Sequence, residues 1–133
     1  MRMKTLFLVE DNQDNADLIR DLVSDQYRLV CFSDGPAVLA ALTQAEAVLP
    51  DLLLLDISLP GMDGKTLLRE IRSRERLKPI PAIALTAHAM KSDKENFIAA
   101  GFNAYLSKPI TDDRLLLEAI EANISSPAIK AAA

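Results

Sequence analysis

Five residues able to bind metal ions or take part in group transfer stand at or just beyond the ends of short apolar runs: Glu10, Asp11, Asp56, Thr86 and Lys108. Three carboxylates held close together repel one another, and some would be protonated unless a cation lay among them. Oxygen ligands without histidine or cysteine favour Mg²⁺ over zinc. A metal ion, a carboxylate nucleophile, a hydroxyl and a lysine form a plausible phosphoryl-transfer site, in which an aspartate would become an acyl phosphate.

These side chains can meet only if the elements that carry them end at one edge of a sheet. Five apolar runs predict strands buried on both faces of a parallel sheet: Thr5–Val9, Leu29–Phe32, Leu52–Leu55, Ile80–Leu85 and Ala104–Leu106. Apolar residues at helical spacing follow each run, so the predicted fold is α/β, with five βα units and helices on both faces. Ligands of such sheets bind at the carboxyl ends of the strands. If the first and third strands are neighbours, the three carboxylates converge there.

Each of the five residues also has a plainer interpretation when taken alone. Glu10 and Asp11 could cap the first helix, because acidic groups are favoured at its positive end. Thr86 could be an ordinary strand-end residue, and Lys108 an ordinary solvated lysine. Asp56 is harder to dismiss, because an acid directly after four leucines needs a reason. Their joint placement at one sheet edge favours a functional site.

Helix boundaries and the remaining apolar stripes follow the same scheme. Asp34-Gly35-Pro36 and Thr111-Asp112-Asp113 have the composition of helix starts. The fourth and fifth helices are predicted to bury stripes that include Ile98 and Leu115, respectively. The glycines between the third strand and the third helix, Gly61 and Gly64, are interpreted as turn formers.

Composition limits the possible classes of function. The chain has 133 residues, half of them hydrophobic, and a formal charge of −4, which predicts one acidic domain and argues against a nucleic-acid binder. One cysteine, Cys31, and one histidine, His88, exclude a disulfide framework and a Cys/His zinc site. The longest uncharged stretch, residues 79–90, is well short of the roughly 20 residues of a membrane span. We therefore expect a cytoplasmic protein without membrane insertion.

Four sequence motifs, in the right order, resemble those of the receiver domain of two-component response regulators. They are Val9-Glu10-Asp11-Asn12, the segment Leu55–Gly64, Leu85-Thr86-Ala87 and Ser107-Lys108-Pro109. The resemblance runs from about Thr5 to Ile124 and implies a flavodoxin-like fold with strand order 2-1-3-4-5. It predicts a receiver domain over residues 1–124, followed by a flexible tail over 125–133. The segment 85–90 is most similar to receivers of single-domain regulators and hybrid histidine kinases.

The resemblance also implies roles for the acidic cluster. Asp56 would be the phosphoacceptor, with a sensor histidine kinase or a histidine phosphotransfer protein as the donor. Asp11 and Asp56 would coordinate Mg²⁺ directly, Glu10 would act through water, and the backbone carbonyl of Ser58 would be a further ligand. Glu10 departs mildly from the aspartate often found at the first position, which lengthens the side chain by one methylene.

Switching would involve residues farther along the chain. Lys108 would pair with a phosphoryl oxygen, and its peptide bond to Pro109 would be cis. Thr86 would hydrogen-bond the phosphoryl group, and Tyr105 would be the aromatic switch that turns inward as Thr86 moves. The added charge would alter the face built from the fourth helix, fifth strand and fifth helix, where a downstream protein would bind.

Ser58 and His88 occupy the two variable positions that tune attack of water on the acyl phosphate in this family. We hypothesise that His88 modulates dephosphorylation, although a solvated or partner-facing ring is the simpler interpretation. Replacing His88 by alanine and timing aspartyl-phosphate decay tests this, since an unchanged half-life would reject it.

Two other functions remain open from the sequence. One is a Mg²⁺-dependent phosphatase with an aspartyl nucleophile, although Asp56-Ile57-Ser58 lacks the D-x-D pattern of the haloacid-dehalogenase type. The other is an interaction module that works unphosphorylated. A Walker A loop is excluded, because Leu59 stands where its first glycine would be, ahead of Gly64-Lys65-Thr66. Since no effector domain follows Ile124, we expect the signal to leave through a protein partner, unless this chain is part of a longer one.

Overall fold

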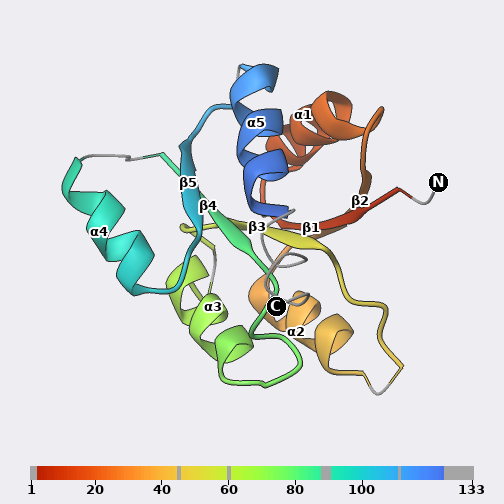
Figure 1. Cartoon of the computed structure of the whole chain (residues 1–133), viewed down its shortest axis with the longest axis vertical. Helices are drawn as coiled ribbons and strands as arrows, with labels where there is room; N and C mark the ends of the chain where they lie inside the picture. Colours follow the sequence, from red (N-terminus) through yellow and green to blue (C-terminus); the bar gives the residue numbers. More distant parts are fainter. Residues whose placement is uncertain (1–2, 45, 60, 88–90, 111, 125–133) are drawn as a thin grey trace.

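The computed structural model describes residues 3–44, 46–59, 61–87, 91–110 and 112–124. Strands and helices alternate along the chain, as the apolar pattern predicts (Figure 1). In chain order the elements are β1 Thr5–Val9, α1 Gln13–Val23, β2 Arg28–Phe32, α2 Gly35–Thr43, β3 Leu52–Asp56, α3 Gly64–Arg72, β4 Ala82–Thr86, α4 Lys91–Ala99, β5 Ala104–Ser107 and α5 Asp113–Ile124.

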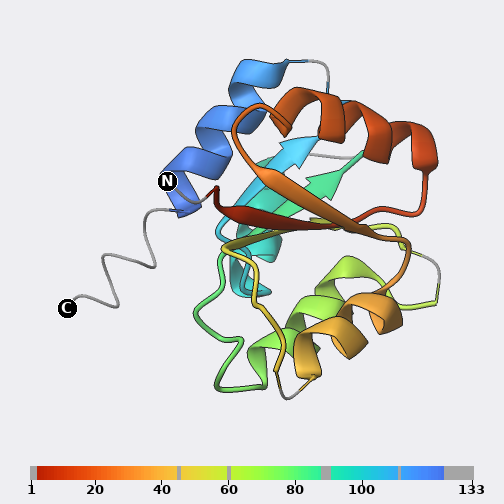
Figure 2. The same ribbon diagram turned by 90° about the vertical axis from the view of Figure 1, so that its right-hand side faces the viewer.

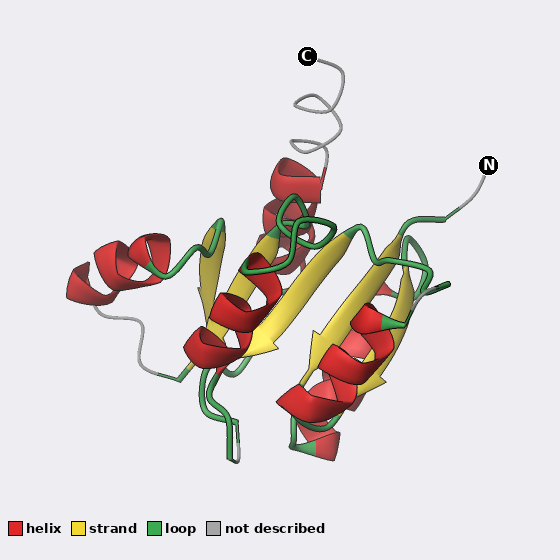
Figure 3. Cartoon of the chain, turned by 90° about the horizontal axis from the view of Figure 1, so that it is seen from below, coloured by secondary structure: helices red, strands yellow, loops and turns green. Residues whose placement is uncertain are grey.

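The five strands form one parallel sheet in the order β2-β1-β3-β4-β5. This is the predicted order, and Figure 3 shows the strands side by side, with helices in front of and behind them. β1 and β3 are neighbours, with Val9 paired to Leu55. The residues that follow Val9 and Leu55 therefore leave the sheet side by side, which brings the acids after β1 next to Asp56.

Two apolar clusters hold the helices on opposite faces of the sheet. α1 and α5 cover one face, and α2 and α3 cover the other (Figure 2). Phe97 of α4 belongs to the same cluster as α2 and α3. Successive strand residues alternate between the clusters, as Leu54 and Leu55 do, because side chains of a strand point alternately to its two faces. The core strands β1, β3 and β4 are buried almost throughout.

Two predictions about burial are wrong. β2 and β5 are edge strands, so most of their residues are half-buried rather than buried on both faces. Ile98 and Leu115 were assigned to buried helix stripes, yet their exposed fractions are 56% and 55%. α4 packs against the half-exposed edge strand β5, which leaves part of its apolar surface uncovered. Both residues belong to helices that flank β5.

The helix-start signals agree with the structure where it describes them. Asp34 caps α2, because its carboxylate accepts a hydrogen bond from the Ala37 backbone N–H at 2.8 Å. Asp112 accepts a hydrogen bond from the Arg114 N–H at 3.0 Å beside the start of α5. Thr111 and the predicted tail, residues 125–133, lie outside the described residues. Among the described helices, none is long and apolar enough to cross a membrane.

Candidate functional site

The three acids predicted to converge do so at the carboxyl edge of the sheet. Glu10, Asp11 and Asp56 each place one carboxylate oxygen within 4.8 Å of the other two. Glu10 and Asp56 are buried, with exposed fractions of 4% and 2%, whereas Asp11 is exposed. The cluster therefore has two acids set into the protein and a third at its mouth.

Lys108 joins the two buried acids. Its ammonium donates a hydrogen bond to Asp56 Oδ2 at 3.0 Å and lies 2.9 Å from Glu10 Oε1. The backbone N–H of Lys108 donates to the carbonyl of Thr86 at 2.7 Å, which fixes the residue beside the end of β4. The Lys108–Pro109 peptide bond is cis, as the family resemblance predicted.

The charges of this cluster are unbalanced. Burial raises the pKa of Glu10 above its usual value, and the nearby carboxylate of Asp56 adds to this, although Lys108 opposes it. For Lys108, burial alone would lower the pKa, but the two carboxylates outweigh it and the pKa is raised. In formal charges, three carboxylates and one ammonium give a net charge of two negative units. Glu10 Oε1 is buried and has no aligned hydrogen-bond donor among the described residues. This oxygen-rich, negative site fits a divalent cation such as Mg²⁺.

Backbone N–H groups orient the two buried carboxylates. Ser58 donates its N–H to Asp56 Oδ1 at 3.0 Å, and Asn12 donates its N–H to Glu10 Oε2 at 3.2 Å. Asn12 is also the N-cap of α1, since its side-chain oxygen accepts from the Asn15 N–H at 3.0 Å. The acids after β1 are therefore not the N-cap of α1, which was the plainer interpretation.

The remaining predicted residues fall at the same edge or on β5. Thr86 is buried at the end of β4, one residue beyond Leu85, which pairs with Asp56. Tyr105 is half-buried on β5, and its ring centroid lies 5.6 Å from that of Phe97. Ser58 is exposed two residues after Asp56, and its predicted role in tuning the attack of water stays a prediction. The prediction for His88 concerns a residue outside the described part of the chain.

The sequence of this chain matches a known protein family. Residues 6–121 match the response regulator receiver domain family. The chain belongs to that family. A curated relative, the polar-differentiation response regulator DivK of Brucella ovis, is 40% identical over 114 residues, covering 85% of this chain and 90% of the relative.

Solved receiver structures are also similar to this receiver domain. One is the receiver domain of a sensor histidine kinase from Pseudomonas aeruginosa, with a magnesium ion coordinated in its active-site cleft. It is 36% identical, has a TM-score of 0.79, and the match covers 93% of this chain and 99% of that one. The phosphorylated cyanobacterial phytochrome response regulator RcpA is 31% identical, with a TM-score of 0.82 and coverage of 94% and 96%. This chain is thus a receiver domain of two-component signalling.

One residue of the receiver site was misjudged from the sequence. Gly64 was interpreted as a turn former, but it is the buried first residue of α3, and its N–H donates to the Ile57 carbonyl at 3.0 Å. A Cβ atom at Gly64 would lie 2.5 Å from the carbonyl oxygen of Asp56. Glycine is needed there because α3 begins against the backbone of the candidate phosphoacceptor. The Asp63-Gly64 pair, which resembles Asp34-Gly35 at the start of α2, was the available signal.

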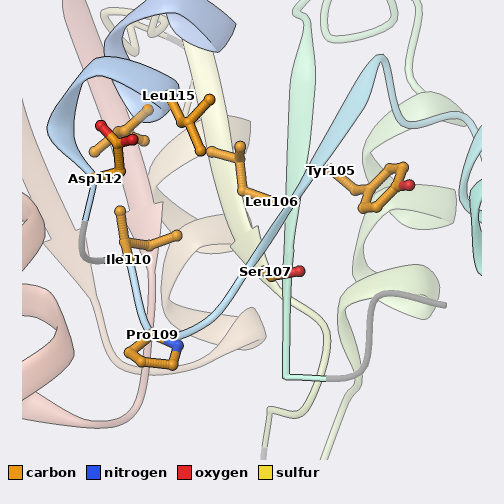
Figure 4. A pocket seen from close by; sticks show the side chains of 8 residues that line it. Tyr105, Leu106, Ser107, Pro109, Ile110, Asp112 and Leu115 are labelled. Atoms are coloured by element: carbon orange, nitrogen blue, oxygen red, sulfur yellow. The ribbon is translucent and has the colours of Figure 1, made fainter.

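A cleft of about 420 Å³ lies between β5 and the start of α5. Figure 4 shows that Leu106 and Leu115 lie on one side of β5, whereas the Tyr105 ring points to the other side. Tyr105 is nevertheless one of the residues that line this open, partly apolar cleft, so the candidate aromatic switch borders it.

Proposed function

We propose that this receiver domain accepts a phosphoryl group on Asp56 in a Mg²⁺-dependent reaction. The observation that carries the proposal is the ammonium of Lys108, which lies between Asp56 and Glu10 in a cluster that still has two excess negative charges. Such a cluster can bind a divalent cation, and the same cation and lysine can face the oxygens of a phosphoryl group. The donor would be a sensor histidine kinase or a histidine phosphotransfer protein.

In the proposed transfer, a carboxylate oxygen of Asp56 forms a bond to phosphorus while the bond from phosphorus to the donor imidazole nitrogen breaks. The electron pair of that bond stays on the imidazole. Ser58 N–H and Lys108 orient the carboxylate before attack, because each donates to one of its two oxygens. Lys108 then has a phosphoryl oxygen to pair with. Bound Mg²⁺, held by Asp11, Asp56 and the Ser58 carbonyl with Glu10 acting through water, would neutralise charge on the phosphoryl oxygens.

The output of the proposed reaction is a changed surface on α4, β5 and α5, to which a downstream protein binds. Thr86 and Tyr105 would couple this surface to the phosphoryl group. The exposed side chains of Ile98 and Leu115 and the cleft beside β5 support protein binding there, since exposed apolar groups around a groove are typical of such sites. Residues 1–124 would form the receiver domain, acting in the cytoplasm.

Incubation with acetyl phosphate and Mg²⁺, followed by intact mass measurement, tests the reaction. We expect a gain of one phosphoryl group that requires Mg²⁺ and that disappears in Asp56→Asn. Asp21→Asn, which changes an exposed acid on α1, is the matched control and should be phosphorylated normally. Modification of Asp56→Asn, or sustained turnover of phosphoesters, would contradict the proposal and favour a different site or a phosphatase.

A further inference from the structure

Arg72, the last residue of α3, joins two loops at the edge of the sheet opposite the acidic cluster. One guanidinium nitrogen donates to the carbonyls of Lys78, at 3.0 Å, and Ile80 in the segment that leads to β4. The other donates to the carbonyl of Gly101 at 3.2 Å and to Asn103 Oδ1 at 3.3 Å, in the turn between α4 and β5. The side chain thus holds the approach to β4 and the approach to β5 together.

All four of these acceptors are neutral oxygens. No carboxylate lies within ion-pair distance of Arg72 in the part of the chain that the structure describes. Burial lowers the pKa of the guanidinium below its usual value, although arginine stays charged. The planar guanidinium has two terminal nitrogens, and here each of them donates to one of the two loops. This fit depends on geometry that a lysine ammonium does not have.

The same turn sets the start of β5. Asn103 exchanges two hydrogen bonds with Ala82 at the start of β4, since its N–H donates to the Ala82 carbonyl at 2.8 Å and its Oδ1 accepts from the Ala82 N–H at 2.9 Å. β5 has four residues and a single neighbouring strand, so few bonds fix its register. Gly101 has a φ of +106° and lies against the Arg72 side chain, since a Cβ atom at this position would be 3.6 Å from Arg72 Nε. Arg72 therefore supports the residues that fix where β5 begins.

This support lies at one end of the proposed switch face. α4 runs from the carboxyl edge of the sheet, after β4, to the amino edge, before β5. Its last turn carries Phe97, whose ring packs on both Phe102 and Tyr105, with centroid distances of 6.1 Å and 5.6 Å. Gly101, which Arg72 holds, stands between α4 and Phe102.

We propose that Arg72 is a positioning residue that, through Gly101 and Asn103, anchors the C-terminal end of α4 and the start of β5, so that phosphorylation moves α4 about this anchored end. The inference rests on the proposed function for its phosphorylated state. In the unphosphorylated protein it requires only that Arg72 restrain the turn 101–103. Because four neutral acceptors hold the guanidinium, a change of charge at Asp56 leaves the anchor in place.

Amide hydrogen exchange in Arg72→Met tests the anchor. We expect the exchange rate of the Asn103 N–H to rise at least tenfold in the unphosphorylated variant, while the β1 and β3 amides keep their rates. Arg69→Met, on an exposed position of the same helix, is the matched control and should leave all these rates unchanged. If Arg72→Met folds poorly, Asn103→Ala takes its place in the test. This variant removes the side-chain oxygen that accepts from both Arg72 and the Ala82 N–H, and we expect the same rise in exchange at position 103.

Exchange measured after treatment with acetyl phosphate and Mg²⁺ separates this proposal from the proposed function. In the unaltered protein, phosphorylation should change the amide exchange rates strongly in the first turn of α4 and less than twofold at 101–103. In Arg72→Met, the change in exchange rate should extend through 101–103. Equal exchange at Asn103 in Arg72→Met and the unaltered protein, or a uniform rise that includes β1 and β3, would overturn the anchor. Failure of the unaltered protein to gain a phosphoryl group would instead reject the proposed function, and the unphosphorylated comparison would still decide the anchor.

Discussion

A single methyl group at Gly64 should disturb both the stability and the chemistry of the receiver site. A Cβ atom there would lie 2.5 Å from the Asp56 carbonyl oxygen, 3.0 Å from Ile57 Cα and 3.1 Å from the Asp56 carbonyl carbon. All three are backbone atoms, so no side-chain rotation relieves the overlap. Either α3 or the loop after β3 must move by about half an ångström to bring the shortest contact to 3.0 Å.

The magnitude follows from two opposing effects. Overpacking of a filled interior costs about 1–3 kcal/mol, while alanine in a helix gains roughly 0.5–1 kcal/mol over glycine. We therefore expect Gly64→Ala to lower the free energy of unfolding by about 1–2 kcal/mol. A misplacement of about 1 Å can cost roughly 100-fold in rate, so half of that predicts about a tenfold slower phosphorylation of Asp56.

Gly35→Ala is the matched control for this prediction. Gly35 is also buried, also begins a helix and also follows an aspartate N-cap, but its Cβ would meet the Met62 Sδ at 3.0 Å, the far part of a flexible side chain. Urea unfolding and the initial rate of phosphorylation by acetyl phosphate measure the two effects. We expect Gly35→Ala to be within about 0.5 kcal/mol of the unaltered protein and to react normally. If Gly64→Ala matched Gly35→Ala in both assays, the backbone clearance at Asp56 would not matter.

Three further predictions concern charge. Asp11→Asn should remove most of the stabilisation by Mg²⁺, measured by urea unfolding with and without the ion. In the unaltered protein this stabilisation reaches roughly 2.7 kcal/mol when the Mg²⁺ concentration is a hundred times Kd. The control variant Asp21→Asn should keep it. Lys108→Met should lower the free energy of unfolding without metal by roughly 3 kcal/mol, because it leaves two buried acids without their cation. For the same reason, Mg²⁺ should stabilise this variant more than it stabilises the unaltered protein. The pKa of Asp63 is lowered, chiefly by the Thr66 N–H, so its N-cap contribution is complete above the unfolded pKa and is lost as pH falls through the folded pKa. Asp63→Ala should cost about 1 kcal/mol at pH 7 and less in acid, whereas Asp63→Asn should keep the cap and lose this pH dependence in unfolding curves.

The central strands and the acidic cluster could be predicted because one physical constraint governs both. A strand such as Leu52–Leu55, buried on both faces, tolerates no charge until the sheet ends, so Asp56 marks both the end of β3 and the site. The same reasoning failed for β2 and β5, because an apolar run does not reveal whether a second strand will cover its outer edge. Strand order had to come from the family resemblance, and the structure then confirmed it.

The contacts that were missed depend on distances between segments far apart in the sequence. Gly64 looks like any turn glycine until α3 is seen to begin against the Asp56 backbone. Arg72 looks like one of several cations in a basic segment, and only the fold shows that its guanidinium is turned inward onto the Gly101 and Asn103 oxygens. The Asp63-Gly64 pair indicates the start of a helix, but local residue types and spacing do not show which distant segment either residue contacts.

Lys108 and Arg72 differ in what holds them, and the difference bears on how the proposed switch could work. Lys108 is held by the carboxylates of Glu10 and Asp56, so its surroundings would change with the proposed binding of Mg²⁺ or the proposed phosphorylation of Asp56. Arg72 is held by neutral carbonyl and amide oxygens, whose attraction does not depend on the charge of the site. β5 begins beside Arg72 and ends beside Lys108. Under the proposed anchor, a change of charge at Asp56 therefore acts on the Lys108 end of β5 and leaves the Arg72 end in place, and in Arg72→Met the change should extend through 101–103.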